Sequence, residues 1–372
     1  MDRAIGKESL QGRAALSGPP ARGGPAPEIL RLQRAAGNRT VTQLVARSAA
    51  SPRRRTLARD YLGDMRAKMI QDAKDGKFRD PAIQAVYSRY GPGSERQRLG
   101  LWYLDSDPAA PPDGAWKHIA WRDIVADAAL RVFDPTLFDQ GPLGVCATAA
   151  TLNLEARLDP PGYASLVWEC FTHGTLKDSD FNSELLRTTP QPGMAVVDWM
   201  LMSAMQSRAN SWYTFSGRPD GHSGTSAKQE RWELREYAGA VETERYDTSD
   251  DADVIPATKK VNALLSQHPT EVEVIIRLSS KVLQNPSSVE HALDHAVALT
   301  KPVTIKEDFT PSHHAFPLGL FGTSPPPHHA IRGTVSADVF TWGKVMTWTG
   351  TVHQWQRMVW AYDVAATRKG IL

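Results

Sequence analysis

The chain has 372 residues, 41% of them hydrophobic, and a formal net charge of +2. This length and composition suffice for a sizeable buried core and suggest about two domains. The near-neutral charge gives no electrostatic reason to expect binding to nucleic acid or to an anionic membrane surface. The two cysteines exclude a disulfide-dense scaffold and are typical of a protein that folds in a reducing cytosol.

The N-terminal segment differs in composition from the rest of the chain. It lacks the apolar stretch of a secretory signal peptide, and the sequence has no run of about 18 apolar residues that would span a membrane. Residues 17–27, SGPPARGGPAP, are too rich in proline and glycine to pack into a core. We therefore expect residues 1–55 to be a flexible segment of a cytoplasmic protein that leaves its cell, if at all, without a signal peptide.

A short motif lies within this segment, at residues 28–47. Its sequence, EILRLQRAAGNRTVTQLVAR, predicts two short helices separated by a stop at Gly37-Asn38. The motif resembles an LQR-x-x-GN-x-x-V-x-x-LL pattern found near the N-termini of actinobacterial proteins linked to extracellular contractile injection systems. The resemblance implies that the protein is cargo of such a particle, and that residues 28–47 bind its tube or a loading factor. The alternative is an amphipathic helix pair that docks onto an unrelated partner.

Residues 56–130 predict further helices. Apolar side chains recur at helical spacing up to Gly76, and a second helical stretch covers residues 81–90. We interpret residues 56–130 as a helical leader or pro-segment-like region. It either inhibits the domain that follows, docks onto a partner or forms part of that domain.

The segment from Asp139 to Ala150, DQGPLGVCATAA, combines an amide, glycines and a cysteine. The sequence that begins at Cys146 predicts a helix to about residue 158, which Asp159-Pro-Pro-Gly162 is expected to end. A cysteine at a helix N-terminus lies at the positive end of the helix dipole, which favours the nucleophilic thiolate. If the glycines turn the chain, the amide of Gln140 and the backbone N–H of Cys146 can share a developing oxyanion.

A candidate base follows at a suitable distance along the chain. His295 lies in DHAVAL, a sequence typical of a strand, and its spacing from Cys146 is within the range of papain-type enzymes. Further on, Thr341 precedes Trp342-Gly343. Together, Gln-Gly-x-x-Gly-x-Cys, the histidine followed by small apolar residues and the Trp-Gly pair resemble the signatures of papain-like cysteine proteases. The resemblance implies an α+β, two-lobed papain-like fold over residues 131–366, in which a helical lobe faces an antiparallel sheet or barrel.

The resemblance also implies the roles of individual residues. Cys146 would be the nucleophile, His295 the base and Gln140 the oxyanion-hole residue. The family uses an asparagine to orient the histidine, and Thr341 occupies that position here. Because a hydroxyl is a weaker orienting partner than an amide or a carboxylate, Asp338 is an alternative partner for the ring.

These residues predict a thiol peptidase that acts as a delivered effector or toxin and cleaves a peptide bond in a protein or peptide substrate. A deamidase, transglutaminase or acyltransferase would use the same Cys/His chemistry up to the acyl-enzyme, and a non-catalytic cargo protein would keep the fold alone. The chemistry requires no cofactor or metal ion, and we expect none. Cys170 follows no glycine turn, so we interpret it as a core residue.

The remaining segments predict the surroundings of the site. Residues 193–205 are apolar on most faces and predict a buried helix, whereas residues 206–258 have the composition of a polar, turn-rich loop. The acidic run DTSDDAD in this loop lacks the glycine and terminal glutamate of an EF-hand, so we expect no metal site there. Strands are expected at residues 271–278, 295–299, 303–306, 344–349 and 358–366. Residues 311–331 predict an exposed proline-rich loop, whose paired histidines point to opposite faces and are not expected to bind a metal ion.

Overall fold

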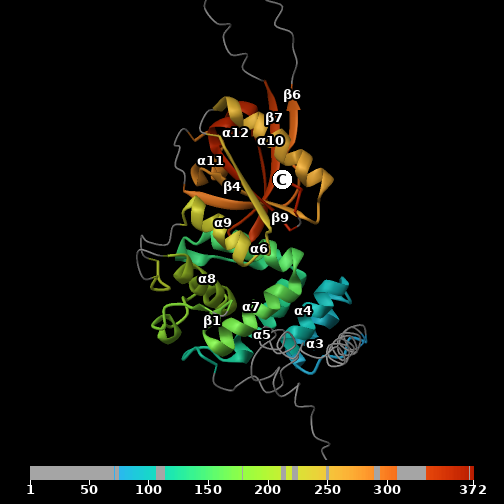
Figure 1. Cartoon of the computed structure of the whole chain (residues 1–372), viewed down its shortest axis with the longest axis vertical. Helices are drawn as coiled ribbons and strands as arrows, with labels where there is room; N and C mark the ends of the chain where they lie inside the picture. The colour runs from blue at the N-terminus through green and yellow to red at the C-terminus, as the bar shows by residue number, and fades with distance from the viewer. Residues whose placement is uncertain are drawn as a thin grey trace, which may run out of the picture. The chain divides into compact units, whose positions relative to one another are not determined.

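A computed structural model describes residues 71, 75–105, 114–177, 179–210, 215–219, 225–248, 251–288, 294–307, 332–367 and 369–372. The chain divides into two units, Met1–Ala67 and Lys68–Leu372. All the described residues, which are coloured in Figure 1, belong to the second unit. The predicted motif at residues 28–47 and the proline-rich loop at residues 311–331 lie outside the described residues. Most of the helix expected up to Gly76 lies outside them as well.

The helical part of the second unit comes first along the chain. Its helices are α3 (Pro81–Tyr90), α4 (Glu95–Asp105), α5 (Trp121–Phe133), α6 (Cys146–Leu158), α7 (Pro160–His173), α8 (Val196–Ala209) and α9 (Ala227–Glu236), with the short 3-10 helices η2 (Pro135–Leu137), η3 (Gly141–Leu143) and η4 (Leu185–Arg187) and the two-stranded ribbon β1 (Thr175–Leu176) and β2 (Ser179–Asp180). Apolar side chains from α3 to α9 form one continuous core. Among the described residues, no helix combines the length and apolar character needed to cross a bilayer.

The helix predicted from Cys146 is confirmed as α6, which ends at Leu158 as expected. Helix α7 begins immediately, at Pro160. Proline fits the first turn of a helix, because the N–H that it lacks has no partner within the helix there. Cys170 of α7 is fully buried, as expected for a core residue.

The later half of the chain forms a curled, half-barrel sheet whose paired strands are all antiparallel. The strands are β3 (Glu242–Asp247), β4 (Val272–Leu278), β5 (His295–Leu299), β6 (Thr304–Glu307), β7 (Gly333–Thr341), β8 (Lys344–Thr351) and β9 (Val359–Ala366), and the helices among them are α10 (Asp251–Gln267), α11 (Ser280–Gln284) and α12 (Val352–Met358). The order across the sheet is β3-β9-β4-β5-β7-β6, and β8 also pairs with β7. The strands predicted from residue 271 onwards are confirmed.

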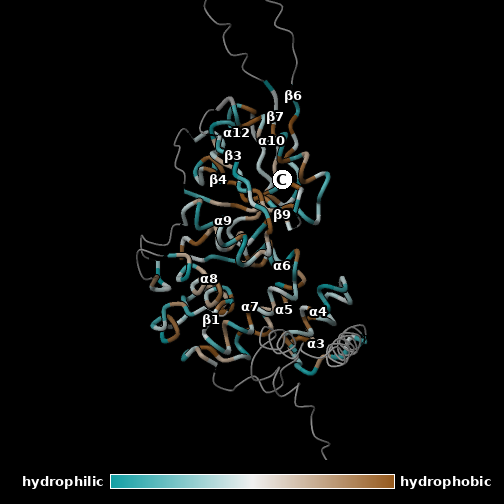
Figure 2. Tube along the Cα trace, in the orientation of Figure 1, coloured by the Kyte–Doolittle hydropathy of each residue, from teal (hydrophilic) through white to brown (hydrophobic). Residues whose placement is uncertain are grey.

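Side chains alternate between the two faces of this sheet, and each face has its own core. In β4, Val274 and Ile276 belong to a core that includes side chains of α10 and α12, whereas Ile275 belongs to the core of the helical part. Apolar residues concentrate along these central strands (Figure 2). The alternation places Glu273 and Arg277 on the same face as Ile275, where the sheet meets α6 and α9.

The loop expected over residues 206–258 is wrong for much of that range, which contains α9, β3 and the start of α10. Helix α9 begins with a capping box, in which Ser226 and Gln229 each bond the backbone N–H of the other. Its sequence, AKQERWELRE, has little apolar character because Glu230 and Glu233 occupy fully buried positions. A pattern search for apolar periodicity therefore overlooks this helix.

Acidic side chains are also buried where α6 meets the sheet. Glu155 of α6 and Glu273 of β4 are 3% and 1% exposed. Burial raises the pKa of both carboxyls, and that of Glu273 reaches about 8. Neither carboxyl oxygen of Glu273 has a hydrogen-bond partner among the described residues. Because a buried carboxylate without partners is costly, the Glu273 carboxyl is mostly protonated at neutral pH.

Glu273 makes the stability depend on pH in a defined direction. The pKa of its carboxyl is about 8 in the folded chain against 4.5 in the unfolded chain, so the folded state holds the proton more tightly. The stabilisation that results is complete below pH 4.5 and is lost as the pH rises through 8. We therefore expect Glu273→Gln to raise the free energy of unfolding over the wild type, by a difference that grows by up to about 1.4 kcal/mol per pH unit across this window.

Urea denaturation at pH 5, 6.5 and 8 measures this difference. Glu184→Gln, at an exposed position, is the matched control, and it should give the same small difference at each pH. A Glu273→Gln variant whose advantage does not increase with pH would show that the carboxyl is ionised in the folded protein.

Candidate active site

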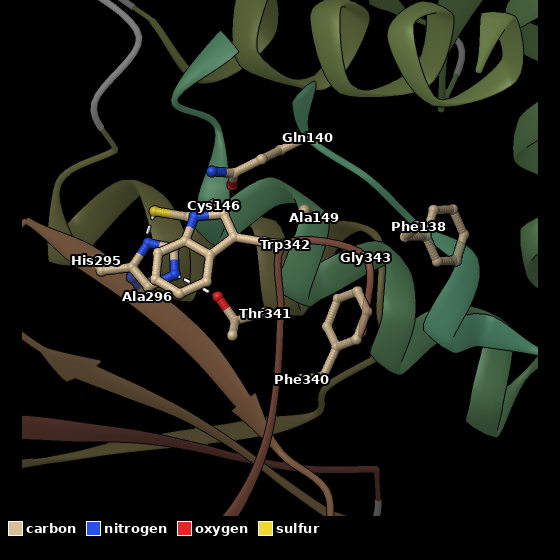
Figure 3. Close-up of a pocket in the computed structure, with 10 residues that line it drawn as sticks. All are labelled: Phe138, Gln140, Cys146, Ala149, His295, Ala296, Phe340, Thr341, Trp342 and Gly343. Carbon is tan, nitrogen blue, oxygen red and sulfur yellow. Dashed lines mark hydrogen bonds between the residues drawn. The ribbon is translucent and has the colours of Figure 1, made fainter. Parts of the chain in front are cut away.

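The sulfur of Cys146 lies at the N-terminus of α6. Gly144, in the left-handed conformation with φ 66°, turns the chain into the helix, and no side chain caps its first turn. The backbone N–H of Ala296, in β5, donates a hydrogen bond to the Cys146 sulfur over 3.3 Å. The half-buried sulfur is thus held between the start of a helix and the start of a strand (Figure 3).

His295 is the first residue of β5 and is 7% exposed. Its imidazole ring lies next to the Cys146 sulfur (Figure 3). The Nε2 atom of the ring is 2.5 Å from the hydroxyl oxygen of Thr341, at the end of β7. When Nε2–H donates to that oxygen, Nδ1 carries the lone pair and is the ring atom able to accept a proton from the thiol.

Trp342 covers the histidine from the other side. Its indole stacks on the His295 ring, with ring centroids 4.5 Å apart and planes inclined by 13°. Trp342 and Gly343 both have positive φ, 45° and 72°, and form the two-residue turn between β7 and β8. Such turns require left-handed residues, which are costly for a tryptophan. The turn fixes the indole over the imidazole and keeps water from that face of the ring.

A buried ion pair holds the segment that carries Gln140. Arg131 of α5 and Asp198 of α8 form two hydrogen bonds of 2.5 and 2.6 Å. Arg131 also donates to the carbonyl oxygen of Leu137, and Asp198 accepts from the backbone N–H of Asp139 over 3.0 Å. Leu137 and Asp139, three residues and one residue before Gln140, are therefore attached to α5 and α8. Figure 3 shows the Gln140 carboxamide beside Cys146.

These side chains enclose a cavity of about 10 Å³. Its walls are formed by Phe138, Gln140, Cys146, Ala149, His295, Ala296, Phe340, Thr341, Trp342 and Gly343. A volume of this size holds about one water molecule. Among the described residues, no group of three or more His, Cys, Asp or Glu side chains is arranged to hold a metal ion.

Asp338, the alternative partner for the histidine, does not line this cavity. Its carboxylate binds the ammonium group of Lys301 over 2.5 Å and the hydroxyl of Thr347 over 2.6 Å. The hydrogen bonds from Lys301 and Thr347 lower the pKa of the Asp338 carboxyl. The structure therefore favours Thr341 over Asp338 as the residue that orients His295.

Burial favours the neutral forms of both reacting groups. It raises the pKa of the Cys146 thiol, and the N–H of Ala296 acts in the opposite direction with a smaller effect. It lowers the pKa of the His295 imidazole to about 4, against a weaker opposite effect of Asp294. The helix dipole argument predicts a stabilised thiolate, but desolvation outweighs the dipole in this closed site.

Two contributions to the site were not foreseen from the sequence. The donor at Ala296 is a backbone group, which a side-chain motif does not reveal. The Arg131–Asp198 pair joins distant parts of the chain, but the sequence carries a signal for it. Asp198 is a lone acid in the apolar run VVDWMLM, and a buried carboxylate requires a partner.

No protein-family model matches the sequence, and no curated protein is similar to it. The chemistry of the site is therefore inferred from its geometry.

Trp342 is expected to hold the imidazole in its neutral form. We expect Trp342→Ala to admit water to the ring and to raise the pKa of His295 from about 4 toward the ordinary value of about 6.5. NMR titration of the imidazole, assigned by comparison with His295→Ala, measures this change. Trp342→Phe keeps an aromatic cover and is the control, with a pKa near that of the wild type. An unchanged pKa of His295 in Trp342→Ala would show that other residues around the cavity, and not Trp342, keep the imidazole neutral.

Proposed function

We propose that this protein is a thiol peptidase of the papain-like type, with Cys146 as the nucleophile and His295 as the base. One observation carries the proposal. A sulfur at a helix N-terminus and an imidazole share one small cavity, and the far nitrogen of the imidazole is bonded to Thr341. The arrangement of a helical part against a curled antiparallel sheet, with the site between α6 and β5, supports a two-lobed papain-like fold.

In the proposed reaction, the Cys146 sulfur attacks the scissile carbonyl carbon while its proton passes to Nδ1 of His295. The carbonyl oxygen becomes an oxyanion, which the backbone N–H of Cys146 and the carboxamide of Gln140 stabilise. The C–N bond then breaks, and the amine leaves with the proton from His295, so that a thioester remains. Water attacks the thioester and gives a proton to His295, which returns it to the departing sulfur.

The pair is proposed to rest as a thiol and a neutral imidazole. Because burial favours the uncharged form of each group, proton transfer accompanies the attack on the substrate and does not precede it. The hydroxyl of Thr341 supports this step, since its oxygen accepts the Nε2–H of the ring and stabilises the positive charge that develops on His295.

We further propose that the peptidase is an effector or toxin carried by a contractile injection particle. This part rests on the motif at residues 28–47 alone, which is proposed to bind the tube or a loading factor before delivery to a target cell. Deletion of residues 28–47 should abolish co-purification with the particle and leave labelling of Cys146 unchanged. Co-purification that survives the deletion would exclude this motif as the docking element.

Cleavage of an unfolded protein such as casein tests the enzymatic role. We expect wild-type protein to generate new N-termini, and Cys146→Ala and His295→Ala to lower the rate by at least a factor of about 10³. His118→Ala replaces an exposed histidine and is the matched control, with full activity expected. Release of ammonia without new N-termini, or incorporation of an added amine, would assign a deamidase or a transglutaminase in place of a peptidase. No reaction in any of these assays would favour a non-catalytic cargo protein.

The pH dependence of cleavage follows from the same two groups. Below about pH 4, His295 is protonated and cannot accept the thiol proton. Above the ordinary thiol pKa of 9, Cys146 loses its proton, and the pair then lacks the proton that the leaving amine needs. We therefore expect a broad bell-shaped profile of initial rates over pH 3–11, with its acid limb near pH 4 and circular dichroism to verify folding at each pH. An acid limb near pH 6.5 would contradict a buried, neutral His295.

A further inference from the structure

A group of charged side chains lies where β3, β4 and β9 meet α9. It consists of Arg277 of β4, Asp363 of β9, Glu230 and Arg231 of α9, and Arg245 of β3. From this group, we infer that Arg277 is the cation that stabilises the thiolate of Cys146. Glu230 is the counter-ion of Arg277, and its charge determines how strongly Arg277 attracts the thiolate. The inference rests on the proposed role of Cys146 as the nucleophile.

Strand pairing places Arg277 close to the sulfur. Arg277 lies directly opposite Ala296 in the antiparallel pair of β4 and β5. Residues opposite each other in such a pair have their side chains on the same face, with Cβ atoms about 5 Å apart. Since the backbone N–H of Ala296 donates to the Cys146 sulfur, Arg277 extends from the strand position next to the sulfur toward the start of α9.

Arg277 has polar partners on α9, on β9 and in the segment just before α9. Its guanidinium donates to the carbonyl oxygen of Thr225 over 2.9 Å and contacts the Glu230 carboxyl, while its Nε lies 3.8 Å from Asp363. That Nε has no hydrogen-bond acceptor among the described residues. Asp363 is already shared, because Arg231 binds one of its oxygens over 3.2 Å and Arg245 the other over 2.8 Å. The ionisation of Glu230 therefore determines the net charge around Arg277.

Glu230 is in an environment that resists ionisation. Its side chain is fully buried, and the guanidinium of Arg277 contacts one of its carboxyl oxygens. It is faced by Asp363 and by Glu233, whose carboxyl accepts the hydroxyl of Thr148 on α6. Burial raises the pKa of Glu230 to about 8, against the opposing effect of Arg277. When Glu230 is protonated, its carboxyl no longer offsets the charge of Arg277 beside the sulfur.

The two side chains act on the thiol in opposite directions. Glu230 raises the pKa of Cys146 and Arg277 lowers it, and both effects are smaller than that of burial. A guanidinium keeps its proton at all relevant pH values, so Arg277 is a constant cation, and only Glu230 changes its charge. Arg277 does not touch the reacting atoms, and its role is to favour the charged state of the sulfur that forms during attack.

The rate of Cys146 alkylation by iodoacetamide tests this inference in the full chain without any substrate. The rate is followed by mass spectrometry of the Cys146 peptide between pH 5 and 11, so the result is independent of whether the protein proves to be a peptidase. We expect Arg277→Gln to lower the rate at pH 7 on the order of tenfold and to move the profile to higher pH. Arg277→Lys, which keeps the charge, should recover most of the rate.

Two further variants separate charge from structure. Glu230→Gln removes the counter-ion and should move the profile to lower pH, opposite to Arg277→Gln. Arg231→Gln also removes an arginine bound to Asp363 but leaves Arg277 in place, and it should keep the wild-type profile. If Arg277→Gln does not fold, the direction in which Glu230→Gln shifts the pH profile of alkylation tests the inference. A wild-type profile in Glu230→Gln, or an Arg277→Lys variant as slow as Arg277→Gln, would overturn the inference.

Discussion

The contact between the first turn of α6 and the first residues of β5 is the constraint on which the rest of the site depends. The hydrogen bond from the backbone N–H of Ala296 to the Cys146 sulfur connects the helical part directly to the sheet. Because His295 precedes Ala296, this bond also sets the position of the imidazole relative to the sulfur. Strand β5 in turn pairs with β7, which brings Thr341 to the ring. A small rotation of α6 against the sheet would move the sulfur away from Ala296 and His295, while the contact of His295 with Thr341 would remain.

The two other walls of the site are held independently of this contact. The Arg131–Asp198 pair attaches the segment before Gln140 to α5 and α8. The turn at Trp342 and Gly343 belongs to the β7–β8 hairpin, and a Cβ at Gly343 would lie only 3.2 Å from Asp139. The hairpin and the Gln140 segment therefore abut each other and close the cavity.

Much of the site could be predicted from the sequence because its residues lie in short, recognisable segments. A glycine-rich turn before Cys146 predicted the start of α6, and the apolar alternation after His295 predicted β5. The structure brings Thr341 rather than Asp338 to the imidazole, since Asp338 is held by Lys301 and Thr347. The charged contacts between α9 and the sheet were not predicted, for a physical reason. Helix α9 buries glutamates where most helices bury apolar residues, so its amphipathic pattern is hidden, and partners such as Arg277 and Glu230 are far apart in the chain.

The closed cavity around Cys146 also has a consequence for how long the protein survives in an oxidising environment. Oxidation of a cysteine to sulfenic acid and beyond increases with its thiolate character and its exposure. The Cys146 sulfur is half-buried, and burial raises the pKa of its thiol, so both factors are low in the resting state. The side chains around the sulfur leave a cavity of only about 10 Å³, which limits the approach of larger oxidants. The surrounding side chains and the raised pKa of the thiol therefore both oppose oxidation of Cys146 in this conformation.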